Sequence, residues 1–184
     1  CKNEWDKMID DDYLTISSLK FWASKDNPRK YNKFVKTEIY TFLSKCTNTT
    51  HVDITKTLHL LCGLNFVCSS IKDGTWYEFK NHRWQEIQSG YSLRKKIKNE
   101  LAIIYTSFRD FCRKAAEFIP DDDKKKIFTK MKKKVNVDKE FFDYADKTQE
   151  EWLAISSECD KVTTCLKTNS FINSIMNEAK FNFY

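Results

Sequence analysis

The sequence predicts an α+β fold that is mostly helical, with helices packed on a small three-stranded antiparallel meander at about residues 65–87. A chain of 184 residues holds one domain, or two small ones if it divides. Its three glycines and two prolines are too few for an all-β sandwich, which needs a turn signal every ~8–12 residues. Apolar residues recur at helical spacing along most of the chain, and only one stretch alternates strictly.

The first two helices are expected on either side of Asn27 and Pro28. Ser17 or Ser18 can cap a short first helix. Pro28 suits the first position of a second helix that runs toward Cys46, because its missing N–H has no partner to lose there.

A polar connector separates the second helix from the third. Thr50 and Asp53 have the spacing of a capping box, in which each side chain accepts from the other residue's backbone N–H. We expect the third helix to start after Thr50 and to end near Gly63.

The meander is predicted from three alternating, aromatic-rich segments, 66–71, 75–80 and 83–87. Asp73–Gly74 and Asn81–His82 are both suitable two-residue hairpin turns. If both loops have two residues, Phe79 pairs with Cys68 and Trp84, and Tyr77 pairs with Ser70 and Glu86. That register predicts one face made of Phe66, Cys68, Tyr77, Phe79 and Trp84, and an opposite cluster of Ile71, Trp76 and Ile87.

A long helix over 92–118 is expected to cover the apolar face of this sheet. Its seam consists of Leu93, Ile97, Leu101, Ile104, Phe108, Phe111, Ala115 and Phe118. Pro120 ends it, and a short helix follows the acidic run 121–123. Thr148 with Glu151 predicts a capping box for the next helix, and Asn169 or Ser170 can open the last one.

The charge is divided along the chain. Residues 1–134 carry 27 basic against 17 acidic side chains, a net +10, while residues 135–184 carry 5 against 9, a net −4. A basic body with an acidic tail fits a polyanionic partner, and it equally fits a domain whose tail docks on a body within an assembly.

No catalytic, cofactor-binding or metal site is predicted. None of the glycines lies in a phosphate-binding loop, and the acidic runs 10–12 and 121–123 are typical of capping or solvated surface. Seven cysteines without a CxxC pair favour free thiols in a reducing compartment over disulfides or structural zinc. His51, His59 and His82 have no local signature of a catalytic base.

Two basic stretches are the candidate nucleic-acid-binding residues, because phosphate binding needs positive charge gathered on one face. Trp76 or Trp84, beside Arg83, could stack on the bases of a single strand. The alternative is a solvated lysine surface with both tryptophans in the core. The candidates are Arg83, Arg94, Lys95, Lys96 and Lys98, followed by Lys124, Lys125, Lys126, Lys130, Lys132, Lys133 and Lys134.

Three stretches in order resemble the poxvirus-type primase-helicases of nucleocytoplasmic large DNA viruses. They are TISSLKFWASKDNP at 15–28, IKDGTWYEFKNHRWQEI at 71–87 and FINSIMNEAKF at 171–181. The middle stretch is the most specific. In that family a primase domain comes first, a connecting segment follows, and a superfamily 3 helicase comes last.

The resemblance implies that residues 1–28 end the primase-associated region and that 29–184 form the connector domain before the helicase. It implies an enzyme in the whole protein, an NTP-dependent DNA helicase with primase, but no catalytic residue in this segment. Expected partners are the primase and helicase domains, DNA and further copies in a ring, with no membrane. The expected location is the host cytoplasm or a viral replication compartment. The alternative is a purely structural protein–protein interaction module that binds no DNA.

Overall fold

The computed structural model describes residues 16–46, 48–118 and 147–184, and it confirms the predicted fold class. The acidic runs 10–12 and 121–123, and the short helix expected after Pro120, lie outside the described residues. The elements are α2 (Ile16–Asp26), α3 (Pro28–Leu43), α4 (His51–Cys62), β1 (Phe66–Ser70), β2 (Thr75–Lys80), β3 (Arg83–Ile87), η1 (Gln88–Gly90), α5 (Tyr91–Lys96), η2 (Ile97–Leu101), α6 (Ala102–Phe118), α8 (Gln149–Cys165) and α9 (Asn169–Asn182).

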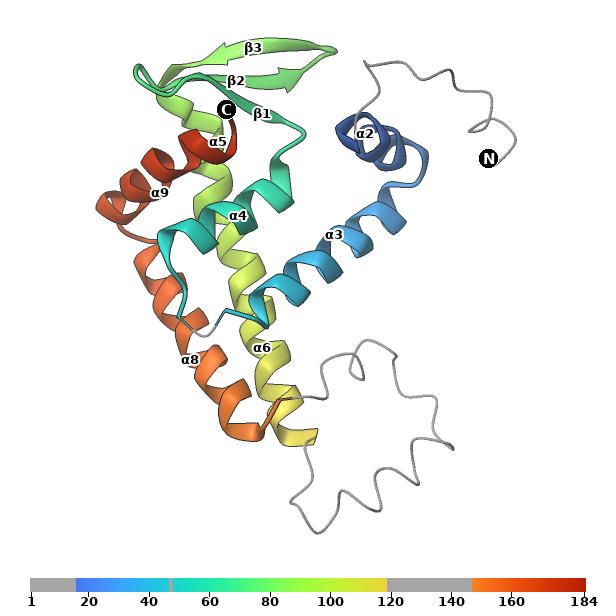
Figure 1. The fold of residues 1–184 in the computed structure, drawn as a ribbon, viewed down its shortest axis with the longest axis vertical. Helices are drawn as coiled ribbons and strands as arrows, with labels where there is room; N and C mark the ends of the chain where they lie inside the picture. The colour runs from blue at the N-terminus through green and yellow to red at the C-terminus, as the bar shows by residue number, and fades with distance from the viewer. Residues whose placement is uncertain (1–15, 47, 119–146) are drawn as a thin grey trace.

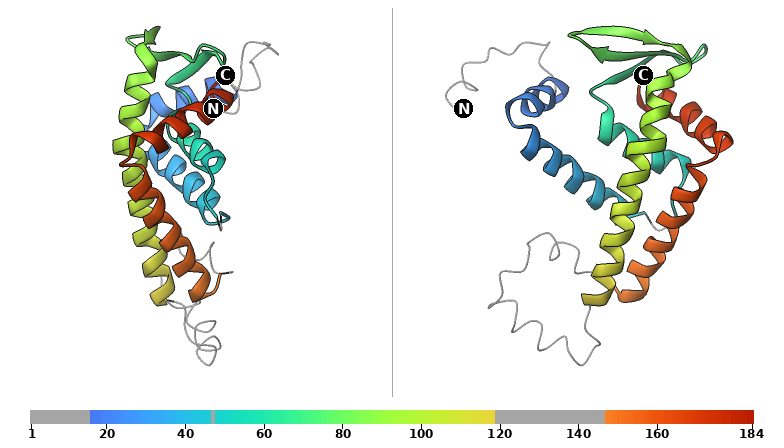
Figure 2. Two further views of the ribbon diagram at one scale, coloured as in Figure 1. Left: turned by 90° about the vertical axis from the view of Figure 1, so that its left-hand side faces the viewer. Right: turned by 180° about the vertical axis from the view of Figure 1, so that it is seen from behind.

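The backbone is organised around one long helical rod with the sheet at its end (Figure 1). The rod consists of α5, η2 and α6 in direct succession. Figure 2 shows α8 running beside α6, and α4 packs on both α9 and α3. The buried apolar residues of all these helices form one continuous core with Phe66, Cys68 and Trp76 of the sheet.

Helix ends follow the capping signals in most cases. Asn27 caps α3 by accepting from the N–H of Lys30, and both predicted capping boxes, at Thr50 and Thr148, are confirmed. The prediction for the first helix is wrong, because the helix already includes Ile16 and so contains Ser17 and Ser18. The last helix begins at Asn169, one of its two predicted opening residues, and Thr168 before it makes no side-chain capping bond.

A π-helical turn at Ile97–Leu101 divides the long helix and changes its buried seam. A π turn inserts one extra residue, so every later side chain rotates around the axis relative to an uninterrupted α-helix. Tyr105 and Cys112 are therefore fully buried, whereas Ile104 and Phe111 lie only partly in the core. The predicted seam is therefore correct up to Leu101. Beyond it Phe108 and Ala115 are buried as predicted, but Tyr105 and Cys112 take the places expected for Ile104 and Phe111.

The first hairpin differs from the prediction. Its loop has four residues, Ile71–Gly74, and Ser70 pairs with Thr75 and Cys68 with Trp76. The Ser70 hydroxyl donates to the Asp73 carboxylate at 2.8 Å and accepts from its N–H at 3.1 Å, which stabilises the longer turn. A bulge between Cys68 and Ser70 adds a further shift of register.

The second hairpin is confirmed as predicted. Asn81 and His82 have φ of 52° and 60°, as a two-residue type I′ turn requires, and Phe79 pairs with Trp84.

The predicted faces of the sheet are consequently wrong, because a change of register by an odd number of residues moves side chains to the opposite face. Trp76 joins Phe66 and Cys68 in the core and is 2% exposed. Tyr77 and Phe79 lie on the outer face with Trp84, which is 48% exposed. Of the two candidate stacking tryptophans, Trp76 therefore lies in the core and Trp84 is accessible.

The inner face of the sheet is covered by α9 and by Phe183 directly after it, and not by the long helix as predicted. The Phe183 ring lies 5.7 Å from that of Trp76, and the N–H of Cys68 donates to the Phe183 carbonyl at 2.7 Å. The long helix meets the sheet at its first turn and then runs away beside α8 (Figure 1).

Gly90, at the junction between sheet and long helix, is a position where alanine should destabilise the fold. Its φ is 64°, and a Cβ there would lie 2.5 Å from Met176 Cε and 3.3 Å from Trp76 Cδ1. We expect Gly90→Ala to lower the free energy of unfolding by about 1–2 kcal/mol, mostly from the left-handed backbone. Urea unfolding measures this, with the neighbouring exposed Gln88→Ala as a control expected within about 0.5 kcal/mol of wild type. Equal stability of Gly90→Ala and wild type would contradict the described junction.

Candidate nucleic-acid interface

The first turns of the long helix carry four residues that lie beside the start of α9. They are Tyr91, Arg94, Lys95 and Lys98. Leu93 and Ile97 are fully buried and fix the orientation of α5. Tyr91, Arg94, Lys95 and Lys98 then share the opposite face, because residues three and four apart lie side by side on a helix. The aromatic segment of the sheet and the Gly90 turn thus position a basic cluster.

This cluster lines a surface pocket of about 290 Å³. We call it the basic pocket. None of the described residues that line it is acidic. The lining residues are Tyr91, Arg94, Lys95, Lys98, Asn99, Asn169 and Ile172.

The cations of the basic pocket are oriented by neutral partners. Arg94 Nη1 donates to Asn173 Oδ1 at 2.6 Å, and its Nε donates to the Ser89 carbonyl at 3.0 Å. Lys98 Nζ donates to Asn169 Oδ1 at 3.0 Å. An amide oxygen holds a cation in place without cancelling its charge, so the positive potential remains available to an anion.

Other cations of the protein are paired with carboxylates instead. Arg109 and Arg113 both contact Asp160, at 2.9 and 2.7 Å. Lys96, which was predicted as a nucleic-acid contact, pairs with Glu100 at 2.7 Å and does not line the basic pocket. The structure therefore separates Lys96 from Lys95 and Lys98, its neighbours in the same basic run.

The N-terminus of α9 adds positive electrostatic potential to the basic pocket. Asn169 is the first residue of this helix. Its N-cap, Thr168, makes no side-chain bond to the first turn, since its hydroxyl donates to the Cys165 carbonyl at 2.8 Å. Helix N-termini carry a partial positive charge that favours anions.

Of the remaining predicted contacts, the structure describes only Arg83, and it does not line this pocket. Arg83 is exposed at the end of β3 that is farther from α5 along the chain, and the strand from Arg83 to Ile87 spans about 13 Å at ~3.3 Å per residue. Seven further candidates lie outside the described residues, namely Lys124, Lys125, Lys126, Lys130, Lys132, Lys133 and Lys134.

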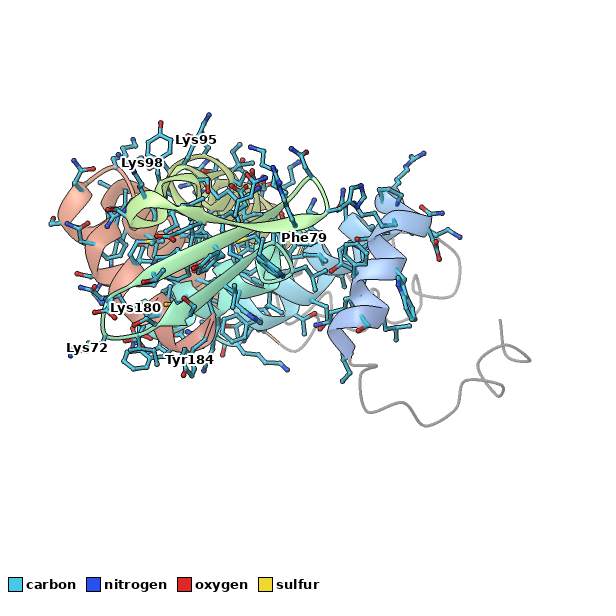
Figure 3. The ribbon with its side chains drawn as sticks, turned by 90° about the horizontal axis from the view of Figure 1, so that it is seen from above. Lys72, Phe79, Lys95, Lys98, Lys180 and Tyr184 are labelled. Atoms are coloured by element: carbon cyan, nitrogen blue, oxygen red, sulfur yellow. The ribbon has the colours of Figure 1, made fainter. Side chains whose placement is uncertain are left out.

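Sequence reasoning missed several residues near this end of the sheet. Asn169 and Asn173 are the same-face pair of α9 that orients the cations, and a four-residue spacing of amides is too common to signal such a role. Figure 3 shows Lys95 and Lys98 on one side of the sheet. Lys72 and Lys180, which do not line the basic pocket, lie on the other side.

Histidine, cysteine and acidic side chains are not clustered in the described part of the chain. No group of three or more His, Cys, Asp or Glu side chains gathers there as a metal site would require. Burial raises the pKa of Cys62 and of Cys159 to about 12, so both thiols are protonated at neutral pH. Within the described ranges no helix has the length and apolarity to cross a membrane.

Comparison with known proteins shows a similarity to a viral protein. No protein-family model matches the chain. It is 37% identical over 108 residues to a protein named "Putative helicase L207/L206" from Acanthamoeba polyphaga mimivirus. The matched region covers 58% of this chain but 11% of that protein's length. The similarity supports a viral helicase-related region.

Proposed function

We propose that this chain is a non-catalytic domain of a viral DNA replication primase-helicase, which links primase to helicase and guides single-stranded DNA across the basic pocket. The main support for the DNA contact is that the cations of the basic pocket have only neutral partners among the described residues. Arg94 and Lys98 are held in place by amide oxygens, and Lys95 beside them is exposed. Phosphate groups would supply the missing negative charge.

The linking role is supported by the resemblance of three ordered stretches to primase-helicases and by the similarity to a protein named as a helicase. In this proposal residues 1–28 end the primase-associated region and 29–184 precede the helicase motor. The whole protein would supply nucleotide hydrolysis and priming, and the domain would aid ring assembly. Its place would be the host cytoplasm or a viral replication compartment.

A salt titration of the wild-type chain tests the DNA contact. We expect fluorescence polarisation with a labelled 20-nucleotide single strand to show binding at low salt that weakens linearly on a log–log plot. Each phosphate neutralised contributes a slope of about −0.7, so the three cations of the basic pocket alone predict about −2. Absence of binding at low salt would contradict the proposal.

That negative result would favour the second candidate, a structural interaction module without DNA binding. A specific observation supports this candidate. Large apolar side chains are exposed on the first two described helices, a pattern typical of protein-contact surfaces. They are Ile16, Leu19 and Trp22 on α2 and Phe34 on α3.

A further inference from the structure

A second cavity lies at the other end of the sheet from the basic pocket. Its volume is about 540 Å³, within the range of ~300–1,000 Å³ that small-molecule sites occupy. It is bounded by α2, α3, the end of α4 and the hairpin between β2 and β3. Figure 3 shows Phe79 on the part of the sheet directed toward α2. We call this cavity the aromatic cleft.

Aromatic rings form two walls of the aromatic cleft. Phe21 of α2 and Phe79 of β2 meet edge to face, with ring centroids 6.0 Å apart. Phe79 also contacts Trp84 at 5.3 Å, and Trp84 continues the aromatic surface onto the outer face of the sheet. Tyr31 and Phe34 of α3 line the opposite side. Such rings can stack on any base, because every base has a π face.

The aromatic cleft is also cationic. Lys20 and Lys25 line it, and among the described residues neither has a carboxylate within 4 Å. Lys25 Nζ lies 5.4 Å from the centroid of the Phe21 ring, so the ammonium is held beside the stacking surface. Glu38 is the one acidic residue among the described lining residues.

His59 supplies a neutral polar group to the same wall. Desolvation, with a smaller contribution from the Lys20 ammonium, lowers the pKa of His59, so the imidazole is uncharged at neutral pH. A neutral imidazole can both donate and accept a hydrogen bond, which suits the edge of a base.

We propose that the aromatic cleft holds an unpaired nucleotide of single-stranded DNA, with the base against Phe21 and Phe79 and the adjoining phosphate near Lys20 and Lys25. This inference rests on the proposed DNA contact, because the same strand would cross the outer face of the sheet from the basic pocket. An apolar peptide side chain would use the rings but leave both ammonium groups without a partner. An acidic peptide would pair with the ammonium groups but leave the aromatic rings without a stacking partner.

The test compares two labelled strands of equal length and charge, one with bases and one in which abasic sites replace them. We expect the wild-type chain to bind the strand with bases about 5- to 150-fold more tightly, the range for stacking of one base. Phe79→Ala and Phe21→Ala should remove this preference and leave the affinity for the abasic strand unchanged. Phe181→Ala, an exposed aromatic on α9 outside the cleft, is the matched control.

Each other outcome separates this inference from the DNA contact at the basic pocket. Equal affinity of the wild-type chain for both strands overturns the inference and leaves the basic pocket intact; a cleft built for a peptide would give this result. A preference that survives both phenylalanine variants also overturns it. No binding of either strand overturns both proposals. If a phenylalanine variant does not fold, Lys25→Gln, which changes an exposed residue, must still weaken binding of the base-bearing strand.

Discussion

Replacement of both Lys95 and Lys98 with glutamate is expected to weaken binding of single-stranded DNA about 100-fold at low salt. A hydrogen bond between a charged side chain and its partner contributes about 1.5–3 kcal/mol, and two such contacts would be lost together. At 1.4 kcal/mol per tenfold change in affinity, the lower limit already corresponds to about 100-fold. The new carboxylates would repel phosphate and add to the loss. Fluorescence polarisation with a labelled strand measures it.

A matched control separates a local contact from a change in net charge. Lys56 and Lys114 are exposed on α4 and α6, and neither lines the basic pocket. The double variant Lys56→Glu, Lys114→Glu alters the net charge by the same four units. We expect it to weaken binding less than tenfold. An equal loss of DNA affinity in the two double variants would mean that binding depends on the total charge of the protein. The basic pocket would then not be the DNA contact.

Phe108→Ala is expected to lower the free energy of unfolding by about 3–5 kcal/mol, the usual range for removal of a buried phenylalanine. The Phe108 side chain is 0% exposed, and its ring lies 4.8 Å from that of Tyr40 on α3 and 5.9 Å from that of Phe111. The variant would leave a cavity where α6 meets α3. Single domains are stable by about 5–15 kcal/mol, so much of the stability would be lost.

Urea unfolding followed by circular dichroism measures this change. Phe181→Ala removes a ring that is 64% exposed and should change the stability by less than about 1 kcal/mol. A loss below about 1 kcal/mol for Phe108→Ala would show that α6 does not pack on α3 as described.

Local signals predicted most helix boundaries, because a cap depends on residues three or four positions apart. Thr50 with Asp53 and Thr148 with Glu151 are of this kind. The first hairpin was predicted wrongly because Asp73–Gly74 is a good two-residue turn by composition. The hydrogen bonds between Ser70 and Asp73 favour a four-residue loop instead. The π turn at Ile97–Leu101 was not predicted, because the apolar residues on both sides of it fit an uninterrupted α-helical spacing.

Only the part of the candidate site that comes from one continuous basic segment could be predicted from the sequence. Lys95 and Lys98 were named from the basic run after the sheet, but so was Lys96, which the structure pairs with Glu100. The amides that orient the pocket are remote in sequence: Arg94 and Asn173 are 79 residues apart, and Lys98 and Asn169 are 71 apart. Only the packing of α9 against the long helix brings them together. The primase-side boundary at residue 28 and the ring remain predictions.

The salt dependence of DNA binding, measured side by side for the wild-type chain and the Lys95→Glu, Lys98→Glu variant, addresses the DNA contact most directly. Two phosphate contacts of a single strand contribute about 1.4 to the slope of log affinity against log salt concentration. We expect the wild-type line to be steeper than the variant line by about this amount. Parallel lines would show that these lysines contact no phosphate.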